Sequence, residues 1–307
     1  MVYTEHMRSD PAYRERLRAC GLDSVRNVLA RVEGRVAAWS RTTDTLYVPG
    51  ADGGPGFYVK RHYFPHWSNR LRGTLRGRFF GQHKGQLEYG ALNALRLAGV
   101  PTVRAVAYGD RRLAHFVTAC FLITEEVPQA QNLTTFALDV AGGRREVTHT
   151  QRRLMIRTLA VQLAEMHAAG ISHGNLFWRN VLVRNGVDER PEFFFLDAQP
   201  MRKWERLGAG SNWWLRELAQ VTVSALQFTT RTERLRFIRD YAGAVKLTPE
   251  GKVQVRQIAR LAATWQSHEE RRIRMNNLFE TWNRNLAEET RQTQRGDEAE
   301  PLAEQLA

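Results

Sequence analysis

Cysteine is scarce in this chain of 307 residues, which contains only Cys20 and Cys120. Neither lies at a metal-ligand spacing, so the sequence argues against a disulfide framework and indicates a reducing compartment. It also lacks an apolar run long enough to span a membrane, and its first ten residues are polar and mixed in charge, unlike a secretory signal. We therefore expect a cytoplasmic protein, or one peripheral on the inner face of the membrane.

Acidic residues are outnumbered, with 32 Asp and Glu against 45 Lys and Arg, which gives a formal net charge of +13. No acidic residue occurs between Lys60 and Glu88, and the basic run from Lys60 to Lys84 is interleaved with aromatic residues. A basic surface attracts polyanions such as nucleic acid, anionic lipid or a phosphorylated glycolipid, and does not by itself choose among them.

Short β-prone runs fill much of the first half of the chain, and helical periodicity dominates the second half. We expect a helix over 11–31, then five strands at 35–40, 45–48, 56–63, 103–108 and 116–124, with one helix inserted between the third and fourth strands. After Pro128 we expect a strong helix over 151–169, short strands at 181–184 and 193–196, and further helices ending near residue 291. This order predicts an α+β fold with a small antiparallel β-rich lobe over 1–127, a larger helical lobe over 128–292 and a flexible tail over 293–307.

The most specific segment follows the predicted helix 151–169. It holds His173, Gly174 and Asn175, then Asn180, and the apolar strand after it ends at Asp197. This order resembles the catalytic and metal-binding loops of protein-kinase-like phosphotransferases. The resemblance implies catalytic roles for Asn175, His173 and Asp197, and implies that Asn180 and Asp197 hold magnesium through hard oxygen ligands. Taken singly, Asp197 is equally readable as a strand-end cap and Asn180 as a turn residue.

Upstream residues fit the same resemblance in the expected order. Lys60 lies on the third strand, where kinases place the lysine that grips the ATP phosphates, and Glu88 lies on the next helix as its ion-pair partner. A snorkelling lysine and a solvated glutamate are the bland alternative. The segment that follows the fifth strand resembles the hinge, where Thr124 would guard the back of the pocket and the backbone of Glu125 to Val127 would meet adenine.

Three further stretches are similar to the lipopolysaccharide kinase family: the helix-to-strand segment 95–109, the basic run, and residues 216–220 with 234–241. Membership would imply a bilobal protein-kinase-like fold, ATP and Mg²⁺ as cofactors, and transfer of phosphate to a sugar hydroxyl. It would also imply an acidic glycolipid acceptor, with the basic run Lys60–Lys84 available to contact a membrane surface. A kinase-like antibiotic phosphotransferase suits a chain of net charge +13 less well, because such acceptors are often cationic.

Two departures from the kinase pattern leave alternatives open. The turn expected between the first two strands, within 39–45, has no glycine, so phosphate contacts there would fall to Ser40, Arg41 or Thr42. Asn175 stands where the family places its catalytic aspartate, and a general base typically contributes about 10²–10⁴-fold to the rate. The alternative function is therefore a nucleotide-binding pseudokinase with a regulatory or scaffolding role. A nucleic-acid binder that uses the basic, aromatic run is a weaker alternative.

Overall fold

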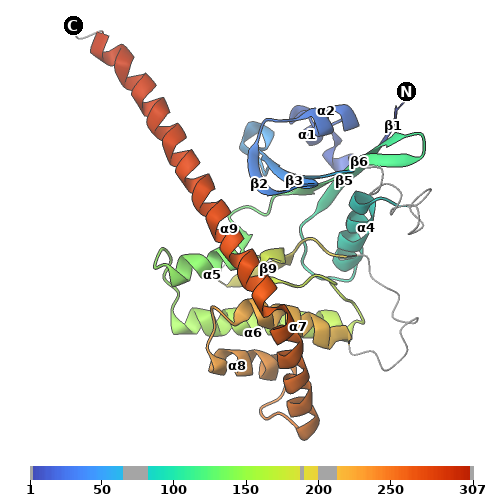
Figure 1. Cartoon of the computed structure of the whole chain (residues 1–307), viewed down its shortest axis with the longest axis vertical. Helices are drawn as coiled ribbons and strands as arrows, with labels where there is room; N and C mark the ends of the chain where they lie inside the picture. Colours follow the sequence, from blue (N-terminus) through green and yellow to red (C-terminus); the bar gives the residue numbers. More distant parts are fainter. Residues whose placement is uncertain (1–2, 65–81, 187–189, 200–212, 305–307) are drawn as a thin grey trace.

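Six antiparallel strands form the sheet of the N-terminal lobe, in the order β1-β5-β6-β4-β3-β2. The computed structural model describes residues 3–64, 82–186, 190–199 and 213–304, and Figure 1 shows the sheet-containing lobe above a helical lobe. The strands are β1 (Tyr3–Ser9), β2 (Arg35–Ser40), β3 (Thr43–Val48), β4 (Phe57–Tyr63), β5 (Ala105–Leu113) and β6 (Phe116–Glu125).

The two faces of this sheet are covered by different helices. Side chains alternate between the faces along a strand. On β4, Phe57 and Val59 are buried against α1 (Arg14–Ala19) and α2 (Val25–Ala30), in a cluster that includes Leu17 and Val28. Lys60, one residue further along β4, therefore faces the opposite side, where α4 (Lys84–Leu97) packs on β4, β5 and β6.

The N-terminal segment differs from the sequence prediction in two ways. The expected helix over 11–31 is broken into the short 3₁₀ turn η1 (Pro11–Tyr13), α1 and α2. Gly21 ends α1 with a left-handed φ of 65°, and the side chain of Ser24 then caps α2. In addition, β1 precedes these helices and pairs with β5, so the prediction of five strands is wrong. Strand β1 lies at the exposed edge of the sheet, and its sequence does not alternate between apolar and polar residues. That alternation is the pattern by which strands are recognised in a sequence.

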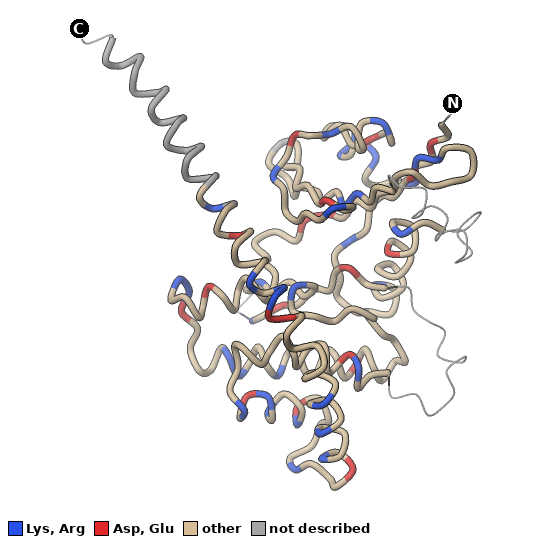
Figure 2. Tube along the Cα trace, in the orientation of Figure 1, with Lys and Arg blue, Asp and Glu red and all other residues tan. Residues whose placement is uncertain are grey.

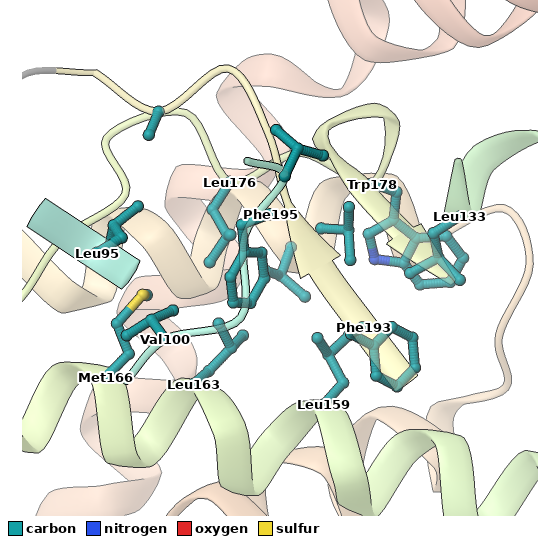
Figure 3. Close-up of a cluster of buried hydrophobic side chains, with 14 of the residues drawn as sticks. Leu95, Val100, Leu133, Leu159, Leu163, Met166, Leu176, Trp178, Phe193 and Phe195 are labelled. Carbon is teal, nitrogen blue, oxygen red and sulfur yellow. The ribbon is translucent and has the colours of Figure 1, made fainter. Parts of the chain in front are cut away.

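The helical lobe is built around α6 (His149–Ala168), which begins with a Thr148–Gln151 capping box. Leu163 of α6 is completely buried, and its cluster includes Phe195 of the small C-terminal sheet and Leu95 of α4, so one core joins the two lobes (Figure 3). The remaining elements are η2 (Ala51–Gly53), β7 (Gln131–Asn132), α5 (Leu133–Ala141), η4 (Trp178–Asn180), β8 (Val181–Asn185), β9 (Pro191–Phe195), α7 (Trp213–Ala225), α8 (Arg231–Tyr241) and α9 (Pro249–Glu304).

The last helix, α9, packs on α7 and α5 and then runs upward beside the N-terminal lobe (Figure 1). It continues to Glu304, so the prediction that the helix stops near residue 291 and gives way to a tail is wrong for 293–304. The added stretch contains Glu, Gln, Arg and Ala, which are strong helix formers. Among the helices that the structure describes, none is long and apolar enough to cross a membrane.

The predicted α+β architecture, with an antiparallel sheet followed by a helical half, is confirmed. Most strands end within two residues of their expected ends. The exception is β5, which continues to Leu113 because it forms a long hairpin with β6 through Ala114, whose φ is 53°. The lobe boundaries at 127 and 292 stay predictions.

Candidate functional site

A lysine and two carboxylates from three separate elements meet between the lobes. Lys60 Nζ on β4 lies 2.9 Å and 3.1 Å from the carboxylate oxygens of Glu88 on α4, and it also contacts Oδ1 of Asp197, which follows β9. The predicted Lys60–Glu88 ion pair is therefore present in the structure. Its shared contact with Asp197, 137 residues away in sequence, assembles three of the predicted site residues at one point.

The charge at this point is unbalanced. Burial alone would lower the pKa of Lys60, but Glu88 and Asp197 outweigh it and raise that pKa. Burial raises the pKa of Glu88 to about 7, against the attraction of Lys60. Two carboxylates share one ammonium group, so with both ionised the cluster retains one negative charge. Such a cluster favours the approach of a further cation.

Asp197 has an unusual backbone, with a φ of 58°. A residue with a Cβ seldom adopts this left-handed conformation, and such residues gather at functional sites. The turn directs the carboxylate back toward residues 173–180, the segment predicted from the sequence to be the catalytic loop. There, the side-chain amide of Asn175 donates a hydrogen bond of 2.7 Å to Oδ2, the carboxylate oxygen that Lys60 does not contact. The backbone conformation therefore positions a carboxylate that is contacted from both lobes, by Lys60 from one and by Asn175 from the other.

Asn180 is held beside the same turn. Its Nδ2 donates to the backbone carbonyl of Asn175 at 2.8 Å, and its own backbone carbonyl accepts from the amide of Leu196, the residue before Asp197. Because Nδ2 donates to Asn175, the amide oxygen of Asn180 is the side-chain atom that could bind a metal. The side chain is buried, which fixes this orientation.

A magnesium ion fits this donor set. Mg²⁺ is bound in kinases through one or two carboxylates or amides together with the nucleotide phosphates, rather than by a cage of protein ligands. Asp197 and Asn180 supply a carboxylate and an amide oxygen of the required kind. In residues 3–64, 82–186, 190–199 and 213–304 there is no group of three or more His, Cys, Asp or Glu side chains that could hold a metal alone.

His173 is completely buried and lies beneath the loop, against the ring of Phe195. Its Nδ1 accepts a hydrogen bond of 3.3 Å from the backbone amide of Asn175, and burial lowers its pKa, so a neutral imidazole is favoured. Gly174 follows with a φ of 77°, and a Cβ at this position would lie 2.9 Å from Cβ of Gln199. These two residues therefore shape the loop, and the catalytic role of His173 stays a prediction.

Three side chains of α7, which the sequence analysis did not identify as site residues, anchor the catalytic loop. Glu217 accepts from the amide of Gly174, Gln220 from that of Leu176 at 2.7 Å, and Ser224 from that of Trp178 at 3.3 Å. The spacing of three and four places all three on one helix face, and it matches alternate amides of the loop. Residues 216–220 were predicted only to resemble the family. The spacing of Glu217, Gln220 and Ser224 was the signal that could have identified them as residues that hold the loop.

A second layer of polar contacts supports these anchors. His167 of α6 lies between Glu217, at 3.0 Å, and the hydroxyl of Tyr241 on α8, at 2.8 Å. Glu269 of α9 accepts from Ser224 at 2.7 Å and pairs with Arg179 of the loop at 2.5 Å, with only 1% of the residue exposed. The catalytic loop is thus tied to all the large helices of the lobe.

The hinge offers fewer free groups than the sequence predicted. The amide of Glu125 donates to the carbonyl of Arg104 at 2.8 Å, and that of Glu126 donates to Gly56 at 2.9 Å. Within the part of the chain that the structure describes, the Val127 amide makes no hydrogen bond, so of the three predicted hinge amides it is the one left to donate. Thr124 lies on β6 opposite Tyr58 of β4, at the inner end of the hinge.

The turn between β2 and β3 is a tight two-residue hairpin at Arg41 and Thr42, with Ser40 paired to Thr43. The carbonyl of Thr42 also accepts from the amide of Tyr63 at 2.9 Å, which ties the turn to β4. The turn is therefore not a wide glycine loop, and phosphate contacts from Ser40, Arg41 or Thr42 stay a prediction. Most of the predicted basic run, over 65–81, lies outside the described residues.

A separate apolar cavity of about 750 Å³ lies in the helical lobe, among α5, α6, α7, α8 and α9. Its lining is mainly aliphatic and aromatic, and Arg152, Arg231 and Arg234 are the cationic residues among its walls. Pockets of this size and apolar character are typical of small-molecule sites. Nothing in the sequence analysis pointed to it, because its walls come from five separate helices.

Known proteins are similar to this chain over much of its length. The model of the lipopolysaccharide kinase (Kdo/WaaP) family matches residues 17–241. The lipopolysaccharide core heptose(I) kinase WaaP of Pseudomonas aeruginosa is 28% identical over 190 residues, which are 61% of this chain and 70% of the relative. The enzyme of the same name from Escherichia coli is 26% identical over 161 residues, 51% of this chain and 59% of the relative.

A solved structure of WaaP in complex with acyl carrier protein is similar in fold. It has a TM-score of 0.55 and 22% sequence identity, and the match covers 87% of this chain and 99% of that chain. This likeness supports the two-lobed architecture.

Proposed function

Because this chain belongs to the lipopolysaccharide kinase (Kdo/WaaP) family, we propose that it transfers the γ-phosphate of ATP to a sugar hydroxyl of a lipopolysaccharide core. The observation that carries the proposal is the meeting of Lys60, Glu88 and Asp197 between the lobes. Phosphoryl transfer depends mainly on positioning and on stabilising charge. A lysine held by carboxylates from both lobes is suited to that task.

The site residues divide between nucleotide and metal. Lys60 would bind the α- and β-phosphates, held by Glu88, and the Val127 amide would meet adenine. Asp197 and Asn180 would hold magnesium, which when bound neutralises charge on the phosphate oxygens. The negative charge left over around Lys60 supports a cation at Asp197.

Asn175 would orient the acceptor hydroxyl. In the reaction, the hydroxyl oxygen forms a bond to the γ-phosphorus while the bond to the β–γ bridging oxygen breaks and ADP leaves, and the hydroxyl proton passes to an oxygen of the transferred phosphoryl group and then to water. The amide of Asn175 cannot accept the hydroxyl proton as a carboxylate does, which lowers the rate by about 10²–10⁴-fold relative to an enzyme with a general base. The loose transition state leaves positioning and charge to supply the remainder.

A pseudokinase is the second candidate, and the contact between Asn175 and Asp197 favours it. In the structure both carboxylate oxygens of Asp197 are occupied, one by Lys60 and the other by Asn175. If these contacts persist with nucleotide bound, the protein would bind ATP without turning it over. Its role would then be regulatory or scaffolding.

Magnesium-dependent ATP binding and turnover of the purified protein distinguish the two candidates. Turnover that Asp197→Asn abolishes would establish a kinase despite Asn175. Binding without turnover would establish the pseudokinase, most clearly if Asn175→Asp then supplied activity. Failure to bind nucleotide would overturn both.

An acyl carrier protein is a proposed partner. The WaaP of similar fold was solved in complex with acyl carrier protein, and the apolar cavity of about 750 Å³ in this chain offers space for an acyl group. Arg231, which makes no ion pair within the described residues, could meet its polar end, whereas Arg152 is paired with Glu233 of the same wall at 2.8 Å. Calorimetric titration with acylated and unacylated carrier protein tests this, and Ala225→Trp in the cavity wall should abolish any preference for the acylated form.

The site of action follows from the cofactor. Because ATP is supplied in the cytoplasm, we propose that the chain works there, on acceptors at the cytoplasmic face of the membrane. Nucleic acid is not part of this proposal, and the basic run that could have bound it lies mostly outside the described residues. Cell fractionation that recovered the chain outside the cytoplasmic and inner-membrane fractions would contradict this placement.

A further inference from the structure

The outward face of α9 between His268 and Trp282 combines exposed apolar and basic side chains. Met275, Leu278 and Trp282 are 60%, 63% and 54% exposed. They follow one another at spacings of three and four residues, so they form one stripe along the helix. Residues 17–241 are those that the family model matches, so this face lies outside the region on which the proposed kinase function is based.

Arginine residues extend and flank this stripe. Arg271 lies four residues before Met275 and continues the apolar stripe. At 100° of rotation per residue, Arg272 and Arg274 lie on opposite sides of that stripe. All three are exposed, and within the described part of the chain none of them makes an ion pair. In Figure 2, Lys and Arg residues are seen on α9 at the level where the two lobes meet.

The carboxylates of the same stretch point elsewhere. Glu269 is buried against Arg179 and Ser224, Glu270 accepts from Gln266 at 2.9 Å, and burial raises the pKa of Glu280 despite Arg35 of β2 and Arg284 nearby. By helical periodicity Glu269 and Glu280 lie on the far side of the helix from Met275, and Glu270 lies beyond Arg274 at one edge of the exposed face. The line of Arg271, Met275, Leu278 and Trp282 at the centre of this face therefore carries no acidic residue over a length of about 16 Å.

From this arrangement we propose that the 268–282 face of α9 lies on an anionic membrane surface. Interfacial helices pair an apolar stripe, which enters the headgroup boundary, with arginines that meet anionic lipid, and tryptophan is favoured at that depth. Charge complementarity selects this occupant over a second copy of the chain, because each copy would present the same cationic face. The chain's net charge of +13 acts in the same direction.

Vesicle co-sedimentation of the full-length protein tests the proposal, with phosphatidylglycerol–phosphatidylcholine vesicles against vesicles of phosphatidylcholine alone. We expect binding to the anionic vesicles only. Two triple variants, Met275→Gln/Leu278→Gln/Trp282→Gln and Arg271→Gln/Arg272→Gln/Arg274→Gln, should each weaken binding by at least about tenfold. All six residues are exposed, so circular dichroism should show unchanged folding. The assay needs neither ATP nor acceptor, so its outcome is independent of the proposed activity.

A matched variant separates this face from diffuse charge. Arg153→Gln/Arg157→Gln/Arg236→Gln removes three exposed arginines from α6 and α8 and changes net charge equally. This control should retain binding, and an equal loss in the control would overturn the proposal. Unchanged vesicle binding in the apolar variant would overturn it too. So would a dimer, seen by sedimentation velocity, that the apolar variant alone converts to monomer without effect on vesicles.

Discussion

The side-chain amide of Asn175 donates a 2.7 Å hydrogen bond to Asp197, on the carboxylate oxygen opposite the one that Lys60 contacts. A carboxylate at position 175 would place two negative charges at this distance. An amide at position 175 therefore allows both carboxylate oxygens of Asp197 to be contacted at once, one by Lys60 and the other by Asn175. Asn175, which stands where a catalytic base was expected, has Asp197 as its hydrogen-bond partner.

Asn175→Asp should make stability depend on magnesium. The substitution replaces a donor by a second carboxylate beside Asp197, and this repulsion should lower the free energy of unfolding by about 1–3 kcal/mol in the absence of divalent cation. Added Mg²⁺ should restore most of the loss, because it can be shared by the two carboxylates. Urea unfolding with and without MgCl₂ measures both quantities.

Asn175→Ala is the control for this prediction. It removes the same hydrogen bond and adds no charge, so its destabilisation should be similar in EDTA and in MgCl₂. If the two variants responded equally to magnesium, repulsion between residue 175 and Asp197 would not be the cause.

Glu88 should give the protein a distinctive pH dependence. Its pKa is about 7 in the folded protein against an ordinary 4.5, so the folded chain binds this proton more tightly than the unfolded chain does. The stability that the group contributes is therefore fully present below about pH 4.5 and is lost as the pH rises to about 7. The difference in free energy of unfolding between the wild-type protein and Glu88→Gln should change across that window and level off above it.

Buried histidines titrate over part of the same range, which is why the difference between two proteins is needed. Burial lowers the pKa of His83 to about 4, so its contribution has the opposite sign and is lost as the pH falls from 6.5. It is common to both proteins and cancels. A difference curve that stayed flat from pH 4.5 to 7 would show that Glu88 titrates normally.

Glu217→Gln should impair catalytic-loop positioning more than nucleotide binding. Glu217 accepts from the amide of Gly174 and from His167, and an amide at this position can keep only one of these contacts without a change of tautomer. We expect a loss of about 1–3 kcal/mol in stability, with kcat reduced and KM for ATP nearly unchanged. Tyr241→Phe removes only the outer hydrogen bond to His167, and should leave kcat close to wild type. If Glu217→Gln and Tyr241→Phe reduced kcat equally, Glu217 would have no specific role in positioning the loop.

The sequence predicted the residues that meet between the lobes but not those that hold them in place. Lys60, Glu88, Asn180 and Asp197 were identifiable because their order along the chain follows a known arrangement. Glu217 and its partners on α7 were not, because their role depends on the helix lying under a loop more than 40 residues earlier. Without that knowledge, polar residues on a mainly apolar helix do not stand out in a sequence.

Regular elements followed the same division. The buried strand β6 and the capped helix α6 were predicted nearly to the residue, since continuous apolar runs and capping signals are local. The edge strand β1 was missed because its partner β5 is about 100 residues away and only that pairing defines it. Its side chains are mostly exposed, so they do not alternate between apolar and polar as the side chains of a strand packed on a core do.

The link from α9 to the catalytic loop gives the last prediction. Glu269 is buried, and it is the shared acceptor of Arg179 and Ser224. Glu269→Ala would leave a guanidinium and a hydroxyl without this partner, at a cost of about 3–5 kcal/mol, and the loop residue Arg179 would lose its anchor. We expect both lower stability and lower kcat, measured by urea unfolding and by turnover. The neighbour Glu270, whose contact with Gln266 is exposed, is the matched control, because Glu270→Ala should change stability by no more than about 0.5 kcal/mol. Equal losses would mean that α9 supports the lobe only by general packing, whereas a loss confined to Glu269→Ala would make a helix outside the matched family region part of the machinery that positions the catalytic loop.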